Sequence, residues 1–323
     1  MTTYKGINGT AVQNFAGNLP GAADGQVWYD STSSDFKYQY VTAAGAWSTG
    51  GSMNTARDWL AGAGQGTQTA SLAFGGETPP NTGATESYNG TSWTEVNDLT
   101  TARTQLAGTG TSTAALAIGG GGVTAVTESW NGTNWTEVAD LNVARSFAAG
   151  AGPSTAALAF GGNSPGDVRD DATESWNGTS WTNVNNMNTG REQPSGFGAT
   201  NTAAIAAGGN APPAVANTES WNGTNWTEVN DLNQARRAAG AAGIQTAALC
   251  FGGDTATPLL ALTEEWNGTN WTEVNDLSTA RNGLTGAGTT AAALAFGGDS
   301  GSLTGATEEW NSPRTVIETI TTT

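Results

Sequence analysis

Residues 103–145 read RTQLAGTGTSTAALAIGGGGVTAVTESWNGTNWTEVADLNVAR, and this stretch decides the fold because the chain repeats it. The copies share an Arg, an apolar run that ends in Gly-Gly, a Thr-Glu pair and a pair of aromatic residues around an Asn-Gly. They follow one another at intervals of about 45 residues, a spacing typical of repeat architectures. The Arg residues that open them are Arg57, Arg103, Arg145, Arg191, Arg236 and Arg281. The chain is therefore an array of six units.

Each unit predicts four short strands, named a to d in chain order. In the quoted copy they are expected at residues 104–110, 114–118, 127–130 and 133–138. Strand b is a continuous apolar run, which is typical of a strand buried on both faces. A four-stranded sheet repeated at this interval of about 45 residues predicts the blades of a β-propeller.

The connection between strands c and d predicts a tight hairpin. Asn131-Gly132 favours a two-residue type I′ turn, because both residues of that turn have positive φ. In this register Trp130 pairs with Thr133. Glu128 then pairs with Trp135, so we expect the two Trp side chains to lie diagonally on one face.

The Gly-Gly pair that ends strand b, the aromatic residues of the c–d hairpin and the Arg that opens the next unit resemble kelch repeats. The hairpin aromatics are Tyr88/Trp93, Trp130/Trp135, Trp176/Trp181, Trp221/Trp226 and Trp266/Trp271. The resemblance implies an all-β fold, a six-bladed kelch-like β-propeller with a small N-terminal β extension. A WD40 propeller is disfavoured, because it would carry Trp-Asp and a His in each blade, and the chain has neither.

The repeat boundaries divide the chain into three regions. We expect an N-terminal extension with an attachment hairpin at 1–45, the propeller at 46–311 and a C-terminal tail at 312–323. Trp47 begins a strand d that has no strand c before it, whereas the strand c at Glu308–Trp310 has no strand d after it. We expect these two strands to pair and complete the last blade, which would remove two open sheet edges.

Composition argues against an enzyme. The chain has no His, which excludes imidazole acid–base chemistry and His-containing metal sites. Cys250 is the single cysteine and is expected in the core, so we predict no disulfide, no metal and no cofactor. A kelch-type enzyme such as galactose oxidase, whose copper site uses His, is the less favoured alternative. The net charge of −17 disfavours nucleic acid and anionic membranes as partners, and no apolar stretch predicts membrane insertion or a signal peptide.

A repeated acidic series matches the Arg series one for one. Its members are Glu86, Glu128, Glu174, Glu219, Glu264 and Glu308. A catalytic residue occurs once, whereas a scaffold residue recurs in every repeat. We therefore expect charge-assisted hydrogen bonds between blades, near the inner rim of the ring. The alternative is a cluster of Arg residues in the pore that binds a substrate.

The loops between strands b and c vary in length and sequence, unlike the rest of the repeat. Strand direction places all six of these b–c loops on one face, together with the turns that join strand d to the next strand a. Loops on a rigid scaffold are common binding sites, so we predict a protein-facing surface there; unconstrained drift is the alternative. The candidate binding residues are Pro79, Pro80, Val123, Val168, Arg169, Pro212, Pro213, Leu259, Leu260 and Leu303.

The N-terminal region provides the main indication of function. Residues 24–40 read DGQVWYDSTSSDFKYQY, which alternates around a Ser/Thr turn and predicts a hairpin. This segment resembles part of the virion fibre and tail proteins of tailed bacteriophages, marine phages among them. The resemblance implies a non-catalytic structural protein at the particle surface, in a multi-copy assembly that contacts other virion proteins or a host glycan or receptor. A free or secreted glycan-binding propeller is the alternative.

Overall fold

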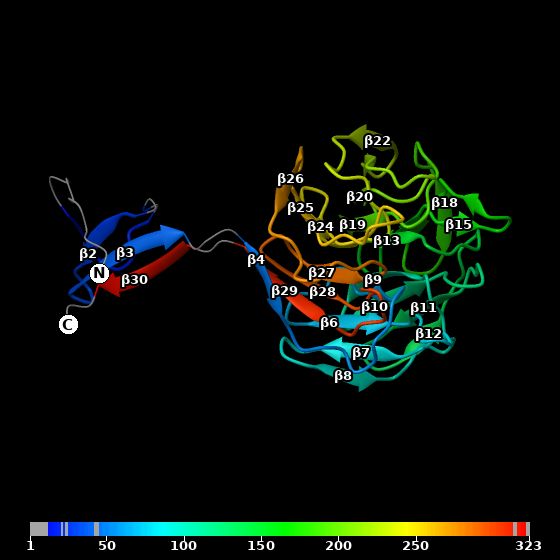
Figure 1. The fold of residues 1–323 in the computed structure, drawn as a ribbon, viewed down its shortest axis with the longest axis horizontal. Helices are drawn as coiled ribbons and strands as arrows, with labels where there is room; N and C mark the ends of the chain where they lie inside the picture. The colour runs from blue at the N-terminus through cyan, green and yellow to red at the C-terminus, as the bar shows by residue number, and fades with distance from the viewer. Residues whose placement is uncertain (1–11, 21, 23–24, 42–44, 313–314, 321–323) are drawn as a thin grey trace. The chain divides into compact units, whose positions relative to one another are not determined.

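The computed structural model describes residues 12–20, 22, 25–41, 45–312 and 315–320. Every regular element among these residues is a β-strand, so the expected all-β class is confirmed. The chain forms two compact units (Figure 1): unit 1 comprises Met1–Gly45 with Ser312–Thr323, and unit 2 comprises Ala46–Asn311.

Unit 2, in which every residue is described, contains six four-stranded antiparallel sheets, named I to VI. Sheet I consists of β5 (Ala61–Gly62), β6 (Ser71–Phe74), β7 (Thr85–Tyr88) and β8 (Trp93–Val96). Sheet II consists of β9 (Ala107–Thr111), β10 (Ala114–Ile118), β11 (Thr127–Trp130) and β12 (Trp135–Glu137). Sheet III consists of β13 (Ala149–Ala151), β14 (Leu158–Phe160), β17 (Thr173–Trp176) and β18 (Trp181–Val184). Sheet IV consists of β19 (Ser195–Thr200), β20 (Ala203–Ala207), β21 (Thr218–Trp221) and β22 (Trp226–Val229). Sheet V consists of β23 (Gly240–Ile244), β24 (Ala247–Phe251), β25 (Thr263–Trp266) and β26 (Trp271–Val274). Sheet VI consists of β27 (Thr285–Gly288), β28 (Ala292–Phe296), β29 (Thr307–Asn311) and β4 (Ala46–Thr49).

The hydrophobic core lies between neighbouring sheets. Residues 115–118 of β10 are all buried, as their continuous apolar run predicts. On an outermost strand such as β8, by contrast, only the leading Trp93 is buried. Phe74 of sheet I packs against Trp135 of sheet II with ring centroids 4.8 Å apart. The apolar side chains of one sheet are therefore covered by the next.

Glycine in the first strand lets adjacent sheets approach closely. A Cβ on Gly286 of β27 would lie 2.4 Å from Cζ of Phe251, the last residue of β24 in the preceding sheet. The equivalent position of sheet V is Ala241, and there the preceding sheet ends its second strand with the small Ala207. A large residue at the end of the second strand thus faces a Gly in the next sheet, whereas a small residue there faces an Ala.

The c–d hairpins differ from the predicted two-residue turn. Trp130 lies directly opposite Trp135, and Glu128 lies opposite Glu137, so the loop has four residues. The side-chain oxygen of Asn131 accepts the main-chain N–H groups of Thr133 and Asn134, both at 2.9 Å. This side-chain bonding competes with the I′ geometry, and only Gly132 of the Asn-Gly pair has a positive φ, of 91°.

The two ends of unit 2 meet in sheet VI. The pairing predicted from the isolated strands is present: β4 pairs with β29, with Trp47 opposite Trp310. The first strand of each sheet contacts that of the next, and β27 of sheet VI contacts β5 of sheet I. Figure 1 shows the first strands β9, β13, β19 and β27 towards the middle of unit 2 and strands such as β8, β18 and β22 at its periphery. The arrangement is compatible with a propeller.

Unit 1 contains a four-stranded sheet in the order β1 (Gln13–Phe15), β2 (Val27–Asp30), β3 (Asp35–Val41), β30 (Thr315–Ile320). β2 and β3 form the hairpin that the sequence predicts. Trp28 is fully buried and donates its indole N–H to the carbonyl of Gly17. The N–H of Gly17 donates in turn to Asp30, which lowers the pKa of that carboxyl to about 2. The segment expected as a separate C-terminal tail instead supplies β30, which pairs with β3.

Candidate functional site

The repeated Arg and Glu residues form buried ion pairs. The pairs are Arg57–Glu86, Arg103–Glu128, Arg145–Glu174, Arg191–Glu219, Arg236–Glu264 and Arg281–Glu308. Their N–O distances run from 2.5 to 3.1 Å. Burial lowers the pKa of Arg57, and the Glu86 charge partly opposes that shift. Because buried charges are costly unless they are paired, these residues hold each other in place.

Each ion pair anchors the segment that leads into its sheet. Glu174 lies on β17 and accepts from Arg145 at 2.7 Å and from the main-chain and side-chain N–H groups of Asn142 at 2.7 and 2.8 Å. Asn142 and Arg145 belong to the connection from sheet II to sheet III. The expected position at the inner rim is wrong, because each Glu lies on the third strand of its sheet rather than on the first. The ion pairs fix the connecting segments and do not join strands of neighbouring sheets.

Main-chain hydrogen bonds link each Arg back to the preceding sheet. The second Gly of every Gly-Gly pair donates to an Arg carbonyl, in the pairs Gly76–Arg103, Gly120–Arg145, Gly162–Arg191, Gly209–Arg236, Gly253–Arg281 and Gly298–Arg57. At the first Gly there is no room for a side chain, since a Cβ on Gly75 would lie 2.6 Å from the Arg103 carbonyl oxygen. Close passage of the next connecting segment explains the diglycine.

A second set of main-chain bonds forms a ring two residues beyond each Arg. We call these six positions the crown residues: Trp59, Gln105, Phe147, Gln193, Ala238 and Gly283. Each donates its N–H to the carbonyl of the crown residue before it, and Trp59 donates to Gly283. All six have φ between 47 and 60°. This region is unfavourable for side chains other than Gly, and such strain is concentrated at functional sites.

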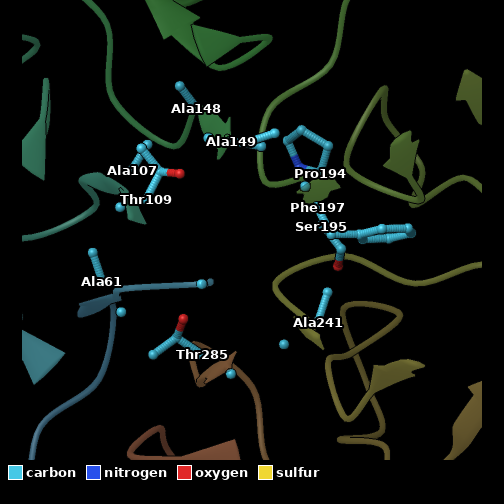
Figure 2. Close-up of a pocket in the computed structure, with 18 of the residues that line it drawn as sticks. Ala61, Ala107, Thr109, Ala148, Ala149, Pro194, Ser195, Phe197, Ala241 and Thr285 are labelled. Atoms are coloured by element: carbon cyan, nitrogen blue, oxygen red, sulfur yellow. The ribbon is translucent and has the colours of Figure 1, made fainter. Parts of the chain in front are cut away.

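The crown surrounds one end of a central cavity of about 140 Å³. First strands of all six sheets line it, and Figure 2 shows the small side chains of Ala61, Ala107, Ala149 and Thr285 around the open centre. Among the described residues, none of those lining the cavity carries a charge. The cavity is therefore a neutral site, with no general acid, base or nucleophile beyond hydroxyl groups.

At the end of the cavity away from the crown, the side chain of Gln65 bridges two sheets. Gln65, just beyond β5 of sheet I, donates through its amide nitrogen to the carbonyls of Gly198 and Ala199 in sheet IV, at 3.0 and 2.8 Å. A ligand would therefore enter from the crown end.

Polar residues surround the crown. The residue after each Arg lies beside the first residue of a b–c loop, as in the bridge between Asp58 and Glu77. Burial, together with the Glu77 and Asp299 carboxylates, raises the pKa of Asp58 to about 6. At the corresponding position of sheet V, Arg237 donates to Asp254 at 2.9 Å. The rim near Trp59 is thus acidic.

The predicted b–c loop residues surround this rim but are not equally accessible. Pro79, Pro80, Pro212, Pro213 and Val168 are exposed, whereas Val123, Arg169, Leu259, Leu260 and Leu303 are half-buried. Leu260 donates its N–H to Gly253 and accepts from Arg281, so main-chain bonds fold this loop back onto the sheet. Leu259 and Leu260, both candidate binding residues, are therefore partly covered.

Sequence reasoning did not find the crown residues. The signal that points to them is variation at one position inside a constant segment: the residue two places after Arg is Trp, Gln, Phe, Gln, Ala or Gly. The predicted role of Cys250 agrees with its position, because it is fully buried and burial raises the pKa of its thiol. Among the described residues no group of acidic or cysteine side chains is placed to hold a metal ion. The described part of the chain also has no helix that could cross a membrane.

The chain was compared with known proteins. It matches no protein family, and no curated protein is significantly similar to it. The fold and the site define an all-β protein of repeated four-stranded sheets, with a neutral central cavity.

Proposed function

We propose that the six sheets are the blades of a closed, six-bladed, kelch-like β-propeller. Two cyclic sets of hydrogen bonds support closure, one through the Arg carbonyls and one through the crown. In each set the last member joins sheet VI to sheet I, as Gly298 to Arg57 and Trp59 to Gly283.

The propeller is a non-catalytic component of the surface of a tailed-phage particle. The face that carries the crown residues, called the crown face, contacts a partner. Two observations carry the non-catalytic assignment: all six repeated Arg–Glu pairs are buried within the scaffold, and the cavity lining is uncharged. A site for acid–base or nucleophilic chemistry needs titratable groups with perturbed pKa values in a pocket. The crown face offers shape and hydrogen bonds instead, which suits binding.

The virion location is supported by the sequence of residues 24–40, which resembles phage fibre and tail segments. Those residues belong to unit 1, together with Ser312–Thr323. Unit 1 is the attachment module, and unit 2 displays the crown face and the b–c loops. The partners are other virion proteins or a host-surface glycan or receptor.

Purified particles test the location, and loop variants test the contact face. Mass spectrometry and immunogold labelling should find the protein on intact virions. Replacement of Pro212–Pro213 and Pro258–Leu260 with Gly/Ser should weaken partner binding and leave folding intact. Absence from purified particles contradicts the virion assignment, and unchanged binding contradicts the assignment of the face.

A free glycan-binding propeller is the second candidate. Trp59 and Phe147 favour it, because they place two aromatic rings at the cavity entrance, 5.0 Å apart between centroids. The two candidates differ in attachment. A free propeller would be recovered in the particle-free fraction of a lysate, whereas a virion protein would be recovered with the particles.

A further inference from the structure

Trp59 is the exception among the tryptophans. The protein has 13 Trp, and each of the others donates its indole N–H to a main-chain carbonyl or a Thr hydroxyl. These are Trp28, Trp47, Trp93, Trp130, Trp135, Trp176, Trp181, Trp221, Trp226, Trp266, Trp271 and Trp310. Within the described structure the Trp59 indole N–H has no acceptor. Its half-buried ring lies at the cavity entrance with an unused donor.

Two glutamines of the crown show the same lack of partners. Gln65, Gln68 and Gln245 bond through their amides to main-chain carbonyls and so serve the scaffold. Among the described contacts, the amides of Gln105 and Gln193 make none, and Oε1 of Gln193 is buried without a hydrogen-bond partner. An unsatisfied buried acceptor is unfavourable, whereas the amide nitrogens of Gln105 and Gln193 are not among the buried unpartnered atoms and can donate to a ligand hydroxyl.

The entrance is asymmetric. Four successive crown residues are large, from Trp59 to Gln193, and the last two are Ala238 and Gly283. The Trp59 indole lies against Gly283, where a Cβ would be 3.4 Å from Cδ2 of the ring. The ring also makes an edge-to-face contact with Phe147, at an interplanar angle of 80°. The chain thus fixes an aromatic platform across the entrance and leaves room beside it.

The chemistry of the entrance selects the class of ligand. Its lining carries no charge, and the rim near Trp59 holds Asp58, Glu77 and Asp299, so an anionic ligand would be repelled. A volume of about 140 Å³ is small beside the 300–1,000 Å³ typical of drug-sized ligands. The ligand should therefore be a single compact ring with an apolar face and several hydroxyl groups.

We propose that the cavity entrance binds one neutral hexopyranose residue of a glycan. Its apolar face stacks on Trp59, and its hydroxyls bond to the Trp59 indole N–H and to the amides of Gln193 and Gln105. This inference rests on the proposed binding function of the crown face and identifies the partner as a neutral glycan.

The test uses the full chain and saturation-transfer NMR with isothermal titration. The probes are the methyl glycosides of glucose, galactose and mannose, together with free hexoses, sialic acid and tetramethylammonium. At least one methyl hexoside should bind, while sialic acid and tetramethylammonium should not. Trp59→Phe and Gln193→Leu should each weaken binding about tenfold, the effect of one lost hydrogen bond with some loss of stacking. Ile244→Ala, an exposed aliphatic change at the far end of β23, is the matched control and should bind as the wild type does.

The outcomes separate this inference from the proposed function. Absence of binding to every methyl hexoside, preference for free reducing sugars or tetramethylammonium, or wild-type affinity in both variants would overturn the glycan site. Melting curves of the variants show whether they fold. Particle labelling can fail while sugar binding persists, which would remove only the virion assignment. Labelled particles that bind no hexoside would leave the virion assignment and remove the glycan site.

Discussion

Trp47 donates its indole N–H to Oγ1 of Thr263 at 3.0 Å, although 216 residues separate them in sequence. The same bond joins every neighbouring pair of sheets, in the pairs Trp93–Thr307, Trp135–Thr85, Trp181–Thr127, Trp226–Thr173 and Trp271–Thr218. A Trp on the outermost strand therefore reaches the third strand of the preceding sheet. The N-terminal strand of unit 2 makes this bond as the other outermost strands do.

The first prediction concerns this inter-sheet bond. Trp47→Phe should lower the free energy of unfolding by about 1 kcal/mol, because it removes the donor to Thr263. Trp59→Phe is the matched control and should leave stability unchanged, since the Trp59 indole N–H has no partner. Chemical denaturation measures both, and hydrogen exchange should show earlier opening of β4 only in the Trp47 variant. Equal stability of the two variants would argue against a closing role for Trp47.

The second prediction concerns packing between sheets V and VI. Gly286→Ala should destabilise the protein by about 1–3 kcal/mol, because the new methyl group overlaps Phe251 and the Ala241 carbonyl. Ala241→Gly changes the equivalent residue of the preceding sheet in the opposite sense and should cost less than about 1 kcal/mol. Thermal melting of the two variants measures the difference. A tolerated Gly286→Ala would mean that the sheets can move apart without cost.

The third prediction concerns the buried ion pairs. Arg145→Ala should lower stability by about 3–5 kcal/mol, because it leaves the Glu174 carboxylate buried without its cation. Arg169 lies in a b–c loop and is 31% exposed, so Arg169→Ala should change stability by less than about 1 kcal/mol. Denaturant unfolding measures both. If Arg145→Ala melted as the wild type but lost partner binding, the Arg series would be a binding site.

The fourth prediction is a pH dependence at the junction of sheets VI and I. Asp58 has a pKa of about 6 in the folded protein against 3.8 for the free side chain, because of burial and the Glu77 and Asp299 charges. The folded state therefore binds the proton more tightly. The contribution of Asp58 protonation to the free energy of unfolding is fully present below about pH 4 and is lost as pH rises through about 6.

Asp58→Asn removes this titration. The variant should be more stable than the wild type at pH 7, and the difference should shrink as pH falls towards 4. Melting temperatures of both proteins across that range measure it. A stability difference that does not vary with pH would show that Asp58 does not titrate in the folded state.

The sequence alone determined the repeat, the order of four strands in it, and the Arg and Glu series. These follow from local information: an apolar run on a strand and a diglycine need only their neighbours to be interpreted. The union of β4 with β29 was also predictable, because an incomplete unit at each end leaves complementary strands. The c–d register was not, since the Asn131 side chain competes with the main chain for the turn.

Only the tertiary structure decided where the candidate site lies. The crown takes one residue from each of the six segments that lead into the sheets, and its hydrogen bonds join residues about 45 positions apart. The sequence also does not show that twelve Trp side chains donate their indole N–H to the scaffold and that Trp59 does not. A partner for an indole N–H is set by what folding brings within about 3 Å. The sequence thus specifies the strands, and the packing of sheets around the cavity decides which side chains remain free to bind.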